Sequence, residues 1–371
     1  MPAELSRVSA QQSTRPFDRP PLNTPQHPRS TPMTVNRQWL LAARPDGMIG
    51  RQNFAYAETP VPELQDDCVL VKNLYLSFDP TQRNWMIDKP GYLPPVAIGE
   101  VMRAGSVGEV VGSRHADFSV GDLVQTAGGW QDYALVAPGQ GPVGLNKLPP
   151  GVSPEMMLSV LGITGLTAYF GLLEHGQPSA GDTVLVSGAA GATGSIVGQI
   201  AKLKGCRVVG IAGGPDKCQW LMDNAGFDAV IDYKNNDVDA QIGHHCPDKW
   251  DIYFDNVGGT ILEAALNHLN LYSRVVLCGA ISGYNATEPV PGPVNLMNLI
   301  TNRGRMQGFI ILDYLPRAME AISELMAWVA AGDIVYQVDL QAGFKNIPST
   351  LQRLYTGQNT GKQLLKLDPA P

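Results

Sequence analysis

Cysteine is scarce in this chain of 371 residues. The five cysteines are Cys68, Cys206, Cys218, Cys246 and Cys278. Their odd number and wide spacing fit neither a disulfide framework nor a zinc knuckle built from closely paired cysteines. We therefore expect a protein of the reducing cytoplasm.

Positive charge and long apolar runs are also lacking. The chain has 27 Lys and Arg against 34 Asp and Glu, a formal net charge of -7. No basic run is present to neutralise a nucleic-acid backbone, and no apolar run approaches the ~20 residues that cross a bilayer. Nucleic acid and membrane are therefore not expected as partners.

Residues 1–34 are rich in Pro, Ser, Gln and Arg and show no apolar periodicity. Such a composition buries too little surface to fold, so we expect a disordered N-terminal tail. An organellar presequence is the alternative, because arginines outnumber acids here, although the prolines oppose an amphipathic helix.

The remaining length suits two domains. Residues 35–158 show short apolar runs between Gly and Pro turns, which predicts a mostly antiparallel β domain. Residues 159–334 alternate apolar helices with β-branched runs at 183–186, 207–210, 229–231, 251–254 and 274–277, which predicts a doubly wound parallel sheet. Residues 335–371 return to short β-like segments and should complete the first domain.

A glycine cluster follows the first predicted parallel strand. Gly188, Gly191 and Gly194 stand at three-residue spacing where strand 183–186 must turn into a helix. Small residues at such a turn let the backbone approach a pyrophosphate at the helix N-terminus, although the strict G-x-G-x-x-G form is not met. The order of strand, cluster and helix indicates a dinucleotide site, and a plain βα turn is the alternative.

The next strand predicts which cofactor is bound. Enzymes that use NAD place an acid at its tip, where this chain has Ala212, Gly213 and Gly214 and then Lys217. The missing acid and the nearby lysine favour NADPH, unless Lys217 is an ordinary solvated helix residue.

Several segments together carry a family resemblance. These are 188–202 (GAAGATGSIVGQIAK), 255–259 (DNVGG), 277–285 (LCGAISGYN) and 357–362 (GQNTGK). They resemble the zinc-independent medium-chain dehydrogenase/reductases, namely the prostaglandin reductases, plant alkenal double-bond reductases and, most of all, bacterial NADPH-dependent curcumin reductases. The likeness runs from residue 36 to 367. It implies an α/β protein with a GroES-like, β-rich catalytic domain and a Rossmann-type NADPH domain, often assembled as a homodimer.

The resemblance also implies roles for single residues. Gly191, Ala192, Thr193 and Gly194 would bind the pyrophosphate, and Lys217 and Tyr233 the adenosine phosphate. Asn256 would lie along the cofactor, and the loop with Cys278, Gly279, Ala280, Ile281 and Tyr284 would pass beside the nicotinamide. Phe309, Ile310 and Ile311 match a strand whose backbone bonds the nicotinamide amide, and Asn359 would close over the cofactor. Taken singly, these residues also suit turns, strand ends or core packing.

Zinc ligands of the kind used by alcohol dehydrogenases of this fold are missing. Ser77 and Asp79 occupy the first ligand region, and 98–100 (IGE) has no histidine. No cysteine has another within ligand spacing, and the pair His244 and His245 reads as a solvated loop. We therefore expect no metal. One family position departs as well, because the common Asp-Pro-Tyr-Met-Arg has Thr81 in place of a tyrosine that lines the substrate pocket.

The expected reaction is reduction of the carbon-carbon double bond of an α,β-unsaturated ketone or aldehyde. Hydride addition to the β-carbon leaves charge on the carbonyl oxygen, which one or two hydrogen-bond donors can stabilise without a metal. The resemblance makes Tyr284 the candidate donor. An NADPH-dependent quinone reductase and a non-catalytic nucleotide-binding protein remain the alternatives.

Overall fold

Short apolar strands dominate the first part of the chain, as their spacing predicts. The computed structural model describes residues 35–139, 141 and 143–369, which belong to one compact unit. The early strands are β1 (Val35–Leu41), β2 (Phe54–Pro60), β3 (Val69–Ser77), β4 (Ser106–Ser113), β5 (Leu123–Thr126), β6 (Tyr133–Val136) and β7 (Asn146–Lys147). A 3-10 helix, η2 (Pro80–Met86), follows β3 and begins the wall of the functional site.

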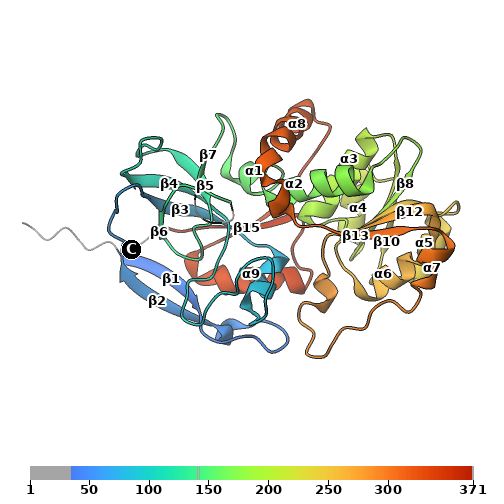
Figure 1. Cartoon of the computed structure of the whole chain (residues 1–371), viewed down its shortest axis with the longest axis horizontal. Helices are drawn as coiled ribbons and strands as arrows, with labels where there is room; N and C mark the ends of the chain where they lie inside the picture. Colours follow the sequence, from blue (N-terminus) through green and yellow to red (C-terminus); the bar gives the residue numbers. More distant parts are fainter. Residues whose placement is uncertain (1–34, 140, 142, 370–371) are drawn as a thin grey trace, which may run out of the picture. The chain divides into compact units, whose positions relative to one another are not determined.

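The end of the chain joins the sheet that these strands form. Strands β14 (Val338–Ala342) and β15 (Lys362–Lys366) complete a seven-stranded sheet of order β14-β15-β3-β4-β5-β7, with β6 also paired to β3. Strand β15 pairs antiparallel with β3, so Leu364 lies opposite Ser77. Figure 1 shows this return, with red β15 beside the blue and teal strands.

A six-stranded parallel sheet occupies the middle of the chain. Its strands are β8 (Thr183–Ser187), β9 (Arg207–Ala212), β10 (Ala229–Asp232), β11 (Trp250–Asp255), β12 (Leu269–Leu277) and β13 (Arg305–Gly308). Their order, β10-β9-β8-β11-β12-β13, is that of a dinucleotide-binding doubly wound sheet. The α/β class with this Rossmann-type sheet is confirmed.

Helices cover this sheet on both faces. They are α2 (Ile163–Phe170), α3 (Ala192–Leu203), α4 (Pro215–Asp223), α5 (Val238–His245), α6 (Gly259–Ala265), α7 (Met297–Thr301) and α8 (Ala318–Ala331), with α1 (Pro154–Leu158) before them and α9 (Ile347–Tyr355) near the end of the chain. Alternate residues of β8 serve the two faces: Val184 and Val186 pack in one core with Ile196 of α3, and Leu185 packs in the other with Ile242 of α5. A strand buried on both faces must be continuously apolar, which is why these strands were readable in the sequence.

A separate core fills the space behind β1 and η2. Trp39, Phe78 and Trp130 are fully buried there and pack with Leu351 of α9 and Leu365 of β15. Each such large apolar side chain contributes about 1.5–3 kcal/mol by leaving water. This core therefore fixes η2 and β15 side by side, and both elements line the site described below.

Two local expectations are wrong. Phe309, Ile310 and Ile311 do not lie in a strand, because β13 ends at Gly308, opposite the last residue of β12, and Ile311 begins the 3-10 helix η5 (Ile311–Arg317). His244 and His245 form the last turn of α5 instead of a loop.

Some expectations stay open. The predicted disordered tail lies outside the described residues, and the boundaries at 158/159 and 334/335 stay predictions. In the described part of the chain, no helix is long and apolar enough to cross a membrane.

Candidate active site

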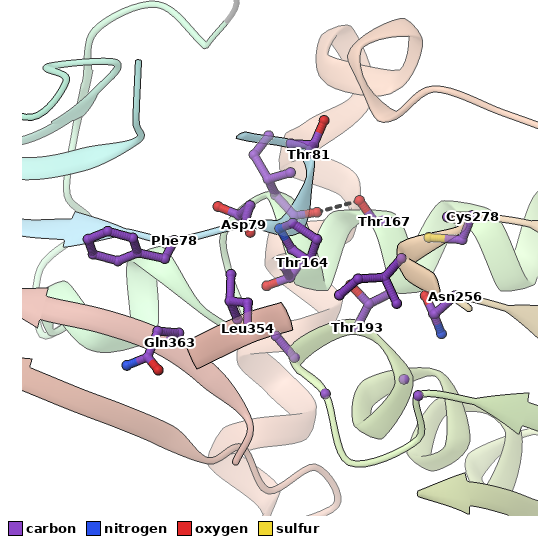
Figure 2. A pocket seen from close by; sticks show the side chains of 18 of the residues that line it. Phe78, Asp79, Thr81, Thr164, Thr167, Thr193, Asn256, Cys278, Leu354 and Gln363 are labelled. Atoms are coloured by element: carbon purple, nitrogen blue, oxygen red, sulfur yellow. Dashed lines mark hydrogen bonds between the residues drawn. The ribbon is translucent and has the colours of Figure 1, made fainter. Parts of the chain in front are cut away.

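One cavity of about 810 Å³ collects almost all the predicted site residues. It lies at the carboxyl ends of the parallel strands, next to the switch point between β8 and β11, where ligands bind in doubly wound sheets. Its other wall comes from β3, η2 and β15. Figure 2 shows Thr193, Asn256 and Cys278 on one side of the cavity and Phe78, Asp79 and Gln363 on the other.

The glycine cluster forms the β8–α3 turn. Gly188 has a positive φ of 59°, and Gly191 is the N-cap of α3. A Cβ on Gly194 would stand 2.4 Å from the carbonyl oxygen of Gly188, so only glycine fits there. The first N–H groups of α3, at Ala192, Thr193 and Gly194, precede the helical hydrogen bonds and border the cavity, as an anion site at a helix N-terminus requires.

The predicted phosphate-binding residues lie together at the tips of β9 and β10. Lys217 of α4 donates from Nζ to the carbonyl oxygen of Gly357 at 2.8 Å. Burial, and then the neighbouring Lys234, lowers the pKa of Lys217. Tyr233 lies over Gly213, where an added Cβ would come within 2.8 Å of its ring. Both residues line the cavity.

Asp232 is the acid at this end that the strand-tip argument overlooked. It is the last residue of β10, not of β9, and its Oδ1 accepts from the backbone N–H of Gly214 at 2.8 Å. Its carboxylate also accepts from the side chain of Asn235, and Asp232 does not border the cavity.

Asn256 is held by a buried polar network below the cavity. Its Nδ2 donates to the backbone oxygen of Ser187 at 2.7 Å, and its backbone N–H donates to the Ser187 hydroxyl at 2.9 Å. That hydroxyl donates in turn to Asp255, which also accepts from Tyr253 and from the backbone N–H of Gly258. The network satisfies the buried carboxylate and leaves Asn256 facing the cavity.

Cys278 directly follows β12 and lines the cavity beside Asn256. Burial first, and then the charge of Asp255, raises the pKa of the Cys278 thiol to about 12. At neutral pH this side chain is therefore a neutral thiol.

Tyr284 approaches the same region from the loop that follows. Its phenol oxygen accepts from the backbone N–H of Ala280 at 3.3 Å, and a Cβ on Gly279 would stand 3.3 Å from that oxygen. The side chain of Asn84, which also lines the cavity, lies near this phenol. Burial raises the pKa of Tyr284, with a smaller opposing effect from the Ala280 N–H.

The other predicted residues also lie at this site, with one exception. Gly279, Ile281, Phe309, Ile310, Ile311 and Asn359 line the cavity, whereas Ala280 does not and contributes only its N–H to Tyr284. Asn359 donates from Nδ2 to Gly361, whose own N–H donates to Ala190 of the glycine-rich turn.

An ion pair in the wall was missed in the sequence. Lys362 of β15 has a side chain only 3% exposed, and it pairs with Asp79 and donates to the backbone oxygen of Phe78. The hydroxyl of Ser77 donates to the other oxygen of Asp79 at 2.7 Å. The region where zinc enzymes of this fold carry a cysteine ligand thus holds a carboxylate neutralised by an ammonium group.

Tyr92 was also missed. Its phenol contacts the hydroxyl of Thr81, and both residues line the cavity. Thr81 is the position where the family commonly has a tyrosine, so a phenol from a different segment reaches the same part of the wall.

The sheet order and the glycine turn define a class. Residues 37–143 match the family described as the N-terminal domain of oxidoreductases, and residues 192–330 match the one described as zinc-binding dehydrogenases. In the described ranges, no group of three or more His, Cys, Asp or Glu is placed to hold a metal ion. The chain belongs to the medium-chain dehydrogenase/reductase family, in the group that the motifs indicated.

Several of its relatives within that family are named as NADP-dependent reductases. The NADPH-dependent curcumin reductase of Escherichia coli is 43% identical over 337 residues, which cover 90% of this chain and 97% of the relative. The NADP-dependent 2-alkenal reductase of Nicotiana tabacum is 40% identical over 82% of this chain and 88% of its own. CurA of Vibrio vulnificus in complex with NADPH matches with a TM-score of 0.85 and 44% identity, over 90% and 99% of the two chains.

Proposed function

We propose that this protein uses NADPH to reduce the carbon-carbon double bond of α,β-unsaturated ketones or aldehydes. The observation that carries the proposal is the buried Tyr284 phenol, which lines the cavity whose other end is the glycine turn of α3. Relatives with this fold and these motifs are named as reductases of conjugated substrates.

The cavity fits NADPH at each part of the cofactor. The N–H groups of Ala192, Thr193 and Gly194 would bind the pyrophosphate, in a turn that an added Cβ would fill. The N–H of Gly191 instead closes that turn by donating to the backbone oxygen of Gly188 at 2.9 Å. Lys217 and Tyr233 would bind the adenosine phosphate, and Asn256, Cys278, Gly279, Ile281 and Asn359 would border the rest. The loop 309–311 offers backbone groups to the nicotinamide amide. When bound, NADPH supplies the hydride that adds to the β-carbon of the substrate.

Tyr284 stabilises the charge that develops on the substrate oxygen. Because burial raises its pKa, the phenol stays protonated at neutral pH and donates without titrating. Its oxygen accepts from Ala280, which holds the phenol in the wall of the cavity. A preorganised donor of this kind lowers the barrier most where charge appears in the transition state. Water then supplies the proton at the α-carbon, which completes the addition of two electrons and two hydrogens.

A substrate screen tests this function. We expect purified protein to oxidise NADPH in the presence of short alkenals, aryl enones such as curcumin, or oxidised lipid ketones, with the saturated carbonyl compound as product. Turnover of quinones alone would favour the quinone reductase alternative. No NADPH oxidation with any of these compounds, despite NADPH binding, would favour a non-catalytic role.

We further propose a homodimer in the cytoplasm. Strand β13 is an edge strand, and Val294, Met297 and Ile300, in the segment before it, are 66–87% exposed, which suits association on this side of the sheet. Light scattering on the purified protein should give twice the mass of one chain, and Ile300→Lys should halve it. The cytoplasmic location is supported by the scattered cysteines, and fractionation of the source cells tests it.

A further inference from the structure

Arg83 is a buried cation that bridges η2 to the loop of Tyr284. The residue is 3% exposed, and its Nε donates to Oδ1 of Asn285 at 3.1 Å. Its Nη2 donates to the backbone oxygens of Pro45 and Gly47 at 3.2 and 3.1 Å. We propose that the bridge from Arg83 to Asn285 positions the Tyr284 phenol to donate its hydrogen bond to the substrate oxygen. Arg83 and Asn285 are then positioning residues of the reductase.

Before Tyr284, its loop is tied to the segment after β11, because the N–H groups of Ile281 and Ser282 donate to the backbone oxygens of Asn256 and Val257. From Tyr284 onward, a tie to a distant element is the Arg83 bond to Asn285. The loop itself is one 3-10 turn, Ile281–Gly283, followed by Tyr284, whose backbone N–H donates to Ile281 at 3.3 Å. The next regular element is α7, which begins at Met297. Asn285 directly follows Tyr284, so its hydrogen bond to Arg83 fixes the backbone next to the tyrosine.

The anchor at the other end of the bridge is rigid. Arg83 lies in η2, which packs against the core of Phe78 and Trp130, and in the described ranges it forms no ion pair. All the hydrogen bonds of this buried cation go to neutral oxygens, and its Nη1 has no partner among the described residues, so it is costly to desolvate. Burial lowers the pKa of Arg83, with smaller opposing effects from Tyr355 and Asp46. A buried charge of this kind adds little to the stability of the fold. Its position is better explained by a need to hold the Tyr284 loop in one orientation.

The bridge acts on catalysis through geometry. Displacement of a catalytic group by about 1 Å can cost up to ~10²-fold in rate. Loss of the tether on one side, with the Ala280 contact retained, should cost less, and we expect roughly a five- to twenty-fold fall in kcat.

The inference rests on the proposed role of Tyr284, and a double-mutant cycle separates the two. Replacing Arg83 would leave two backbone oxygens without donors and risks unfolding, so the variant is Asn285→Ala. It is compared with Tyr284→Phe and with the double variant, in steady-state assays against an enone at saturating NADPH. Asn285→Asp keeps the acceptor for Arg83, and Asn224→Ala, at the exposed end of α4, is the matched control.

We expect Asn285→Ala to lower kcat while the KM for NADPH and the melting temperature stay near parental values. Asn285→Asp should restore most of the rate, and the control should match the parent. In the Tyr284→Phe background, the alanine change should have almost no further effect, because the group that it positions is gone. Additive losses would overturn the inference alone. Parental activity of Tyr284→Phe would overturn the role of Tyr284 and the inference with it.

Discussion

Lys217 is expected to set the preference for NADPH over NADH, and Lys217→Ala tests this directly. In the free protein its Nζ has one partner, the backbone oxygen of Gly357, so the ammonium group keeps two donors for a 2′-phosphate. A charge-assisted hydrogen bond contributes about 1.5–3 kcal/mol. Its loss should therefore lower kcat/KM for NADPH by about 10- to 150-fold.

The assay compares the two cofactors in the same variants. Lys217→Ala should leave kcat/KM for NADH nearly unchanged, because NADH carries no 2′-phosphate. Lys345→Ala removes the same charge from an exposed site in η6 (Phe344–Asn346) and should alter neither value. Equal losses with both cofactors would refute the phosphate role.

The pH dependence gives a second measurement on the same residue. Burial lowers the pKa of Lys217, so as the pH rises its charge is lost earlier than that of an ordinary lysine. The preference for NADPH should then fall at a lower pH than the ordinary lysine value of about 10.4 would give. A preference that is constant through this range would place the discriminating charge elsewhere.

Three further outcomes are expected. Tyr284→Phe should lower kcat for enones by up to ~10²-fold with little change in NADPH affinity, and a defect confined to cofactor binding would reassign this residue to loop ordering. Gly194→Ala places a Cβ 2.4 Å from the Gly188 oxygen, so it should lower the stability by about 1–3 kcal/mol and weaken NADPH binding. Gly292→Ala has open space around it and should change neither property. Thermal melts measure the stability, and fluorescence titration measures NADPH binding. Activity should survive chelation, because the Asp79 carboxylate is already paired with Lys362; activity that is lost on chelation and restored by zinc would contradict this.

The parallel sheet was predictable because burial on both faces forces its strands to be apolar. Strands β8 to β12 were each found near their true positions for this reason. Strand β13 was not, since an edge strand with the sequence RMQG has three of its four residues exposed and no apolar run. The residues expected to form a strand, 309–311, directly follow β13, which ends at Gly308.

The site was predictable where function depends on local sequence. The glycine turn, Lys217 and Tyr284 stand in motifs that a single segment carries. The pair of Lys362 and Asp79 joins residues 283 positions apart, and the contact of Thr81 with Tyr92 depends on how one loop folds back. No spacing rule reports such pairs, because they arise only when separate strands and loops are brought together.

The protonation state of the Cys278 thiol bears on how the enzyme tolerates reactive substrates. Conjugated enones and enals are Michael acceptors that alkylate nucleophilic thiolates, and Cys278 lies in the wall of the cavity that would hold them. With its pKa raised to about 12 by burial, this thiol is almost entirely neutral at neutral pH and is a poor nucleophile. We therefore expect the protein to hold such an electrophile beside Cys278 with little alkylation of its own thiol.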